Sequence, residues 1–287
     1  WGQTGIIGKL SLKFTNFSFA NLFRKNDNFR GFLPQGDGQT LTISGQTNGQ
    51  YYQSYSISFL DPWFGGKRPN SLSVSAFYSV QTDVSSQYYN SAYMNNYYNY
   101  LSGYGNYYGG YYDNYESYYD PDKSIKMFGL SLGWGKRLRW PDDYFTLMAE
   151  LSYQRFMLKD WSYLYIMLNN GQYMNTGNCN SLSLNLTLSR NSTDNPIFPR
   201  YGSEFSASLQ ITPPYSLFSK KDYSTYGKNN YDEAASMYKW IEYHKWKFKA
   251  KTYTALMDIQ KCPVIMTRTE FGILGHFNKY KRSPFET

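Results

Sequence analysis

The sequence contains little of the chemistry from which enzyme and metal sites are built. Its 287 residues include two cysteines, Cys179 and Cys262, and two histidines, His244 and His276. The cysteines form no C-x-x-C pair, so a zinc or haem site is not expected. Neither histidine is accompanied by a nucleophile motif such as G-x-S-x-G. We therefore expect no enzymatic activity, no cofactor and no metal within these residues.

Charged residues and long apolar runs are also scarce. Asp, Glu, Lys and Arg make up 17% of the chain, against about a quarter in ordinary soluble proteins. No apolar run approaches the roughly 18 residues that a membrane-spanning helix needs. The net charge of +8 would suit nucleic acid or an anionic membrane surface, but the cations form no polybasic block. Aromatic residues are abundant, at 20%.

The dominant pattern is strict alternation of apolar and polar residues, which is typical of β-strands with one apolar and one polar face. It is clearest in SLSLNLTLS, where leucine takes every second position from Leu182 to Leu188. We predict ten such strands, around residues 9–15, 40–47, 54–59, 71–79, 129–135, 144–153, 181–189, 204–212, 241–255 and 264–277.

Strand and loop lengths favour an all-β, antiparallel transmembrane β-barrel over a soluble β-sandwich. Most segments run nine residues or more, whereas strands in soluble sheets usually have about 5–6. A strand of about 9–11 residues, tilted, is long enough to cross a bilayer. Short turns alternate with long polar connections at about 80–124, 158–178 and 213–238. Short periplasmic turns and long extracellular loops are typical of outer-membrane barrels. The sandwich is the alternative, and the serine-rich polar faces count against it.

The connection 80–124 includes a tyrosine-rich stretch, 88–120, which holds 14 of the 32 tyrosines. Tyrosine mixed with Asn, Ser and Gly resembles the composition of antibody loops, where Tyr gives a large contact area at low entropic cost. Two interpretations stay open, namely a solvent-exposed insertion with little order and a docking surface for a cell-surface partner. The candidate docking residues are Tyr97, Tyr98, Tyr107, Tyr108, Tyr111 and Tyr112.

The segment HKWKFKAK (244–251) puts four lysines on one face and Trp, Phe and Ala on the other. A lipid-facing lysine costs about 2–4 kcal/mol at the bilayer midplane. We therefore expect a set of lumen-facing charges: Lys245, Lys247, Lys249, Lys251, Arg268 and Glu270. Pairing of the lysines with Glu270 across the strands is favoured over a substrate path. Nucleic-acid binding is not expected, because a stacking platform needs charge and aromatic rings on the same face.

The expected topology also separates the two cysteines. Cys179 begins a strand at the end with long loops, and Cys262 lies in a short turn at the opposite end. A disulfide needs a Cα–Cα separation of roughly 4–7 Å. We therefore expect both to be free thiols.

Two long stretches resemble the barrel of the BamA family of outer-membrane β-barrel assembly factors. The first, 26–79, contains the hairpin TNGQYYQSYS and the turn DPWFGGKRPNSLSVS. In the second, 188–214, an Asn-Pro, an aromatic-Pro and a Gly precede a strand. The motif residues are Asp61, Pro62, Trp63, Gly65 and Gly66 in the first turn and Asn195, Pro196, Phe198, Pro199 and Gly202 in the second.

The resemblance implies a sixteen-stranded barrel preceded by periplasmic POTRA repeats. Residues 1–287 would form one partial barrel domain comprising the second to eleventh strands. The first strand, the last five strands, the family's Arg-Gly-aromatic loop, the lateral gate and the POTRA repeats would lie outside this chain. We therefore expect an open, curved wall rather than a closed ten-stranded barrel.

The resemblance also implies a function without covalent chemistry. The protein would lie in the bacterial outer membrane as the central barrel subunit of the machine that folds and inserts β-barrel proteins. Its partners would be unfolded client barrels, outer-membrane lipids, accessory lipoproteins and cell-surface proteins. The alternative is an outer-membrane porin or gated solute channel with a cationic lumen.

Overall fold

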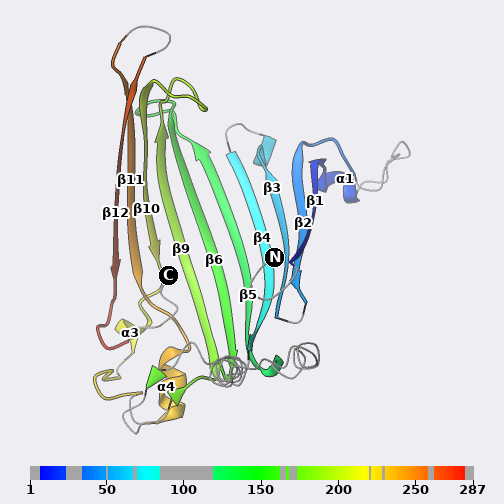
Figure 1. The fold of residues 1–287 in the computed structure, drawn as a ribbon, viewed down its shortest axis with the longest axis vertical. Helices are drawn as coiled ribbons and strands as arrows, with labels where there is room; N and C mark the ends of the chain where they lie inside the picture. The colour runs from blue at the N-terminus through cyan, green and yellow to red at the C-terminus, as the bar shows by residue number, and fades with distance from the viewer. Residues whose placement is uncertain are drawn as a thin grey trace, which may run out of the picture.

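One ten-stranded antiparallel sheet dominates the computed structural model, which describes residues 7–23, 34–49, 51–66, 70–84, 119–161, 166–167, 173–219, 221–227, 230–257 and 262–281. Its strands follow one another in chain order (Figure 1). They are β1 (Gly8–Phe17), β2 (Gln39–Asn48), β3 (Tyr52–Asp61), β4 (Asn70–Val84), β5 (Tyr119–Arg137), β6 (Phe145–Lys159), β9 (Gly177–Asn191), β10 (Tyr201–Ile211), β11 (His244–Ala255) and β12 (Val264–Gly275). All ten predicted strands are confirmed.

Shorter elements lie in the connections. Helix α1 (Phe19–Phe23) follows β1, and the 3-10 turn η1 (Phe64–Gly66) follows β3. A separate two-stranded sheet, β7 (Ile166–Met167) with β8 (Tyr173–Met174), lies between β6 and β9 in sequence.

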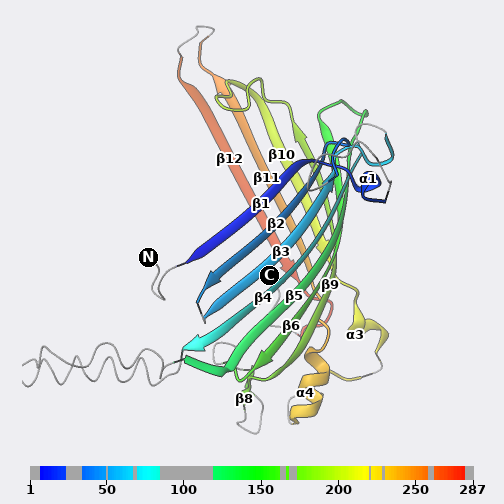
Figure 2. The ribbon, with the colours of Figure 1, turned by 90° about the vertical axis from the view of Figure 1, so that its right-hand side faces the viewer.

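The sheet does not close on itself. Within the described residues, β1 pairs only with β2 and β12 pairs only with β11. Figure 1 shows β1 and β12 near the two lateral margins of the wall, and Figure 2 shows its strong curvature. The expected open, curved wall is therefore confirmed.

The connections define two ends of the wall. The short-turn end holds the β1–β2, β3–β4, β5–β6, β9–β10 and β11–β12 connections, and the long-loop end holds the others. The predicted alternation has two exceptions. At the short-turn end, β1 and β2 are joined by residues 18–38, a longer connection than residues 160–176 between β6 and β9 at the long-loop end. At the long-loop end, β2 and β3 are joined tightly, and Tyr51 N donates to Asn48 O at 3.1 Å. Hairpin length depends on local turn residues, not on the end of the barrel at which the turn lies.

The predicted loop boundaries at 80–124 and 158–178 are too wide. Val84 at the end of β4 pairs with Tyr119 at the start of β5, so strand pairing continues into the expected loop. Likewise, β6 runs to Lys159 and β9 starts at Gly177. The reason is that ladder hydrogen bonds join backbone groups, so a polar sequence can prolong a strand after the apolar alternation has ended.

The strand registers keep the alternation in phase across the whole sheet, so that each face is continuous. Residues that pair across strands share a face. Apolar pairs include Leu12–Ile43, Ile43–Ile57, Val74–Leu132, Leu132–Leu151, Leu151–Leu184 and Leu209–Trp246. Many of these side chains are exposed, Leu132 by 50%. A contiguous apolar surface of this extent marks contact with a membrane or with protein.

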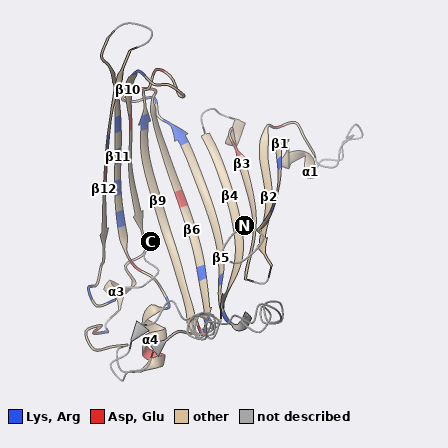
Figure 3. Cartoon of the chain, in the orientation of Figure 1, with Lys and Arg blue, Asp and Glu red and all other residues tan. Residues whose placement is uncertain are grey.

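The opposite, polar face is joined by hydroxyl pairs. Cross-strand Oγ–Oγ hydrogen bonds are 2.7 Å for Ser44–Ser56, 2.7 Å for Ser75–Ser131 and 2.8 Å for Ser152–Ser183. Charged residues are sparse along the strands, as Figure 3 shows. This face is therefore hydrophilic mainly through neutral groups.

Buried apolar side chains gather at the long-loop end rather than within the sheet. We call the described part of residues 212–243 the loop module; it includes α3 (Tyr215–Phe218) and α4 (Tyr231–Tyr238). The composition of 231–240 permits a short helix without requiring one, and the structure has one there. Asn230 caps α4 by accepting a hydrogen bond from Asp232 N at 3.2 Å. The module supplies five buried apolar residues: Tyr223, Ala234, Met237, Ile241 and Tyr243.

Candidate functional site

The basic strand β11 is paired with carboxylates on both sides. Lys249 lies opposite Glu270 of β12, and the Nζ–Oε1 distance is 3.6 Å. Lys251 Nζ lies 3.3 Å from Glu204 Oε2 of β10, and Arg268 Nη2 lies 2.5 Å from Glu270 Oε1. The expected pairing of Glu270 with the lysines is present at Lys249. Sequence reasoning missed Glu204, although the β10 alternation would have placed it on the face of the lysines.

The other half of the lysine row has neutral neighbours. Lys245 pairs in register with Gln210 and Leu274. Lys247 likewise lies opposite a serine and a glycine. No ion pair among the described residues includes either lysine. This half of the row therefore carries uncompensated positive charge, which attracts anions.

Asp61 organises the first of the two family-like turns. Its Oδ1 accepts a hydrogen bond from Trp63 N at 2.9 Å, and its Oδ2 accepts one from Gln39 Nε2 at 3.0 Å. Gly65 and Gly66 have φ of 72° and 68°, in the left-handed region that glycine tolerates best. These residues therefore shape the backbone between β3 and β4.

The second turn is organised by Asp194, which precedes the predicted motif. Its Oδ1 accepts hydrogen bonds from Arg200 N at 2.9 Å and Tyr201 N at 3.2 Å. The Arg200 N–H holds the pKa of this carboxyl below its ordinary value. Gly202 has φ of 108°, and a Cβ at that position would overlap the carbonyl oxygen of Ser192.

Asn195 closes the tip of the same turn. Its Oδ1 accepts from Ile197 N at 2.8 Å and from Phe198 N at 3.2 Å. The prolines Pro196 and Pro199 flank this tip, and Phe198 is 78% exposed. Both turns are thus built from backbone-directed hydrogen bonds and special φ values.

The remaining sequence predictions concern the loop tyrosines, the cysteines and a metal site. The six tyrosines proposed for docking lie outside the described residues. Both cysteines are free, as predicted; Cys179 Sγ donates to Tyr238 O at 2.9 Å. Among the described residues there is no group of His, Cys, Asp and Glu that could hold a metal ion. No helix in that part of the chain is both long and apolar enough for a transmembrane span.

The comparisons with known proteins agree with this architecture. A family profile described as the Omp85 superfamily domain matches residues 34–287. The chain belongs to the Omp85 superfamily. The matched region includes every strand of the Omp85 wall after β1.

A solved structure gives the same fold for this Omp85 chain. It is the crystal structure of BamA from Haemophilus ducreyi lacking POTRA domains 1–3, with a TM-score of 0.52 and 17% sequence identity. The similarity covers 88% of this chain and 38% of that one. No curated protein sequence matches the chain. The fold is therefore an antiparallel transmembrane β-barrel wall, and this chain spans well under half of the BamA chain.

Proposed function

We propose that this chain forms part of the barrel of an outer-membrane protein-assembly factor, which folds and inserts β-barrel proteins without covalent chemistry. The observation that carries the proposal is the Omp85 wall itself, with one continuous apolar and one continuous polar face. In lipid, backbone groups at a strand edge must find hydrogen-bond partners. An assembly factor uses such groups to pair with incoming client strands. This chain supplies part of the barrel wall, its lipid-facing surface and the loops. Strands outside this chain supply the seam at which the family pairs with client strands.

In this proposal, the two faces and two ends have defined environments. The apolar face meets lipid, because the polar face would be strongly disfavoured there. The polar face lines the lumen and carries Lys245, Lys247, Lys249, Lys251, Arg268 and Glu270. The short-turn end is periplasmic and the long-loop end extracellular. The partners are unfolded client barrels, outer-membrane lipids, accessory lipoproteins and cell-surface proteins.

The decisive experiment is depletion of the full-length protein followed by quantitative proteomics of the outer membrane. A general fall in β-barrel proteins, with outer-membrane lipoproteins held as the reference class, supports an assembly role. Unchanged barrel protein levels after depletion would overturn it. A complementary measurement is the rate at which a client barrel folds into vesicles that contain the purified protein, compared with empty vesicles.

A porin or gated solute channel is the second candidate, and it is favoured by one observation. Lys245 and Lys247 are the lysines of the row that lack ion pairs among the described residues, and uncompensated lumen cations select for anions. Loss of one solute's uptake on depletion, with barrel proteins unchanged, would support this function. The corresponding test for a channel measures the anion selectivity of the purified protein in planar bilayers. The double variant Lys245→Gln with Lys247→Gln would reduce this selectivity.

A further inference from the structure

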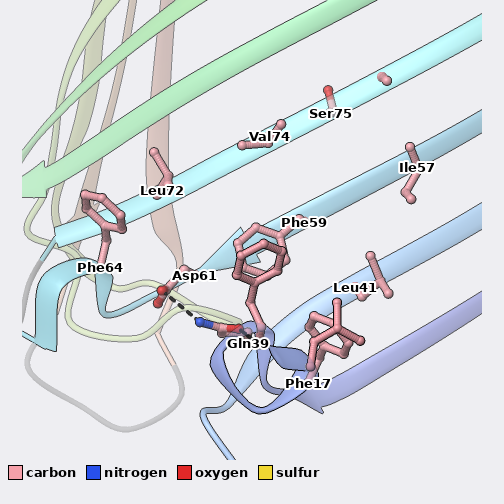
Figure 4. Close-up of a pocket in the computed structure, with 13 residues that line it drawn as sticks. Phe17, Gln39, Leu41, Ile57, Phe59, Asp61, Phe64, Leu72, Val74 and Ser75 are labelled. Atoms are coloured by element: carbon pink, nitrogen blue, oxygen red, sulfur yellow. Dashed lines mark hydrogen bonds between the residues drawn. The ribbon is translucent and has the colours of Figure 1, made fainter. Parts of the chain in front are cut away.

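An apolar groove of ≈ 550 Å³ lies on the apolar face of the wall at the short-turn end. Its base is formed by side chains of β2, β3 and β4, and α1 lies beside it (Figure 4). Binding sites for small molecules usually measure about 300–1,000 Å³, so the volume suits a ligand. The lining includes Leu41, Ile57, Phe59, Leu72 and Val74.

A bulge in β1 builds one side of the groove. The β1–β2 register shifts between Phe14 and Phe17, so Phe17 turns onto the apolar face, where it is only 6% exposed. Its ring packs edge-on against Phe59, with the centroids 6.2 Å apart, and the Phe19 ring lies 6.0 Å from Phe59. Aromatic rings thus form a fixed corner at this end of the groove.

A chain of hydrogen bonds holds α1 in place. Ser18, which is fully buried, accepts from Asn21 N at 3.1 Å and so caps the helix. Phe19 N donates to Gln39 Oε1 at 2.7 Å, and Gln39 Nε2 donates to Asp61 Oδ2 at 3.0 Å. Gln39 is 8% exposed. Its amide nitrogen and oxygen both have partners, so the polar end of the groove does not require a polar ligand.

We propose that this groove holds an acyl chain of a phospholipid from the periplasmic leaflet. The groove is continuous with the apolar face, so under the orientation of the proposed function its mouth opens into hydrocarbon at the height of the short-turn end. Lipid tails are as apolar as leucine, so entry has no hydrophobic driving force and depends on van der Waals packing. The aromatic corner and α1 supply contacts that the exposed remainder of the face lacks.

Photolabelling tests this proposal directly. The full-length protein is reconstituted into vesicles of phosphatidylethanolamine and phosphatidylglycerol that contain a phosphatidylethanolamine with a diazirine in its acyl chain. After irradiation, peptide mass spectrometry compares adducts on β2–β4 with adducts near Phe205, which lies on the same face and near the same end. We expect severalfold enrichment in the groove.

Two variants sharpen the result. Val74→Trp fills the groove and should remove the enrichment. Leu132 pairs with Val74 across the strands but lies outside the groove, so Leu132→Trp should preserve the enrichment. Phe19→Ala, which removes a ring from α1, should also reduce labelling. Unchanged labelling near Phe205 in Val74→Trp and Phe19→Ala separates loss of the groove from loss of folding.

The possible failures are distinguishable. Equal labelling of the groove and the Phe205 region overturns the acyl-chain site but leaves the orientation intact. Labelling of neither region contradicts the orientation on which the site rests. A groove that stays unlabelled beside a labelled Phe205 region means that protein covers it, which also overturns the proposal. None of these outcomes depends on client assembly activity.

Discussion

The ten-stranded wall and the loop module are stabilised in different ways. The wall exposes large apolar side chains along its strands, and Leu10 is 69% exposed. The loop module buries its apolar groups, with Ala234 at 0% and Ile241 at 1%. It also contains Glu242, whose carboxylate lies 3.4 Å from Lys281 Nζ and accepts from Ser216 N at 2.7 Å. The strands of the wall are thus joined by backbone ladders and leave their apolar side chains to the surrounding medium. The module is stabilised by buried packing, in which Ile241 and Tyr243 cluster with Cys179 of β9 and Phe156 of β6.

The same difference in burial separates the ion pairs of the two regions, and it predicts which pair contributes more to stability. The side chains of Glu242 and Lys281 are 0% and 6% exposed, whereas those of Glu270 and Arg268 are 41% and 55% exposed. Breaking a buried pair leaves an uncompensated charge without water, and breaking an exposed pair does not. The comparison can be tested at four places.

The largest effect is expected at Glu242. Glu242→Gln leaves Lys281 buried without its counter-charge, so we expect the module to open more readily by about 3–5 kcal/mol. Hydrogen exchange of the amides in 231–243 measures this opening. Glu270→Gln is the matched variant in the wall, and its effect should be at most about 1 kcal/mol. Equal effects at the two positions would show that burial does not decide how much an ion pair contributes here.

A lysine placed on either face of the wall tests the proposed orientation. Leu132→Lys, on the apolar face, should destabilise the folded barrel in vesicles by about 2–4 kcal/mol. Ser131→Lys, at the adjacent residue on the polar face, removes the hydrogen bond to Ser75 and should cost only about 1 kcal/mol. Urea unfolding of the reconstituted protein, followed by tryptophan fluorescence, gives both values. If Ser131→Lys were the more damaging variant, the assignment of the faces would be reversed.

In the turn between β9 and β10, a substitution that creates steric overlap should destabilise the protein more than one that only forces an unfavourable backbone conformation. Gly202→Ala combines a positive φ with a clash against Ser192 O, and a conformation forced on a residue in this way costs about 1–3 kcal/mol. Gly65→Ala has a positive φ of 72° but open space around its Cβ, so its cost should be smaller. The same unfolding measurement compares them, and a larger loss at Gly65 would contradict the steric account.

The smallest effect concerns pH at the same turn. Because the pKa of Asp194 is lowered in the folded protein, its contribution is present above the pKa of the unfolded state. It is lost as pH falls through the folded pKa. Protection of the Arg200 and Tyr201 amides, corrected for intrinsic exchange, should therefore fall in acid. Asp194→Asn keeps an acceptor that does not titrate and should remove this pH dependence.

The strand pattern could be predicted because it is local. The side-chain contacts between segments far apart in the sequence could not be predicted, because no local pattern indicates them. Alternation over Leu182–Leu188 identifies β9 without knowledge of its neighbours, and adjacency of β11 and β12 predicts the pairing of Lys249 with Glu270. In contrast, Glu242 and Lys281 are 39 residues apart. Gln39 and Asp61 are 22 residues apart, and they meet because they follow the Thr40–Leu60 pair of the β2–β3 ladder.

The prolonged β4–β5 ladder sets the place where the tyrosine-rich segment joins the barrel. The ladder follows the 15 residues of β4, because the pairing skips residues 121–123 of β5. At about 3.4 Å per residue it is roughly 50 Å long, and a tilt of about 45° leaves roughly 36 Å along the membrane normal, against a hydrocarbon core of about 30 Å. Under the proposed orientation, the pair Val84–Tyr119 at the end of the ladder therefore lies at the level of the lipid headgroups. The tyrosine-rich segment is thus anchored at the membrane surface by two paired strands.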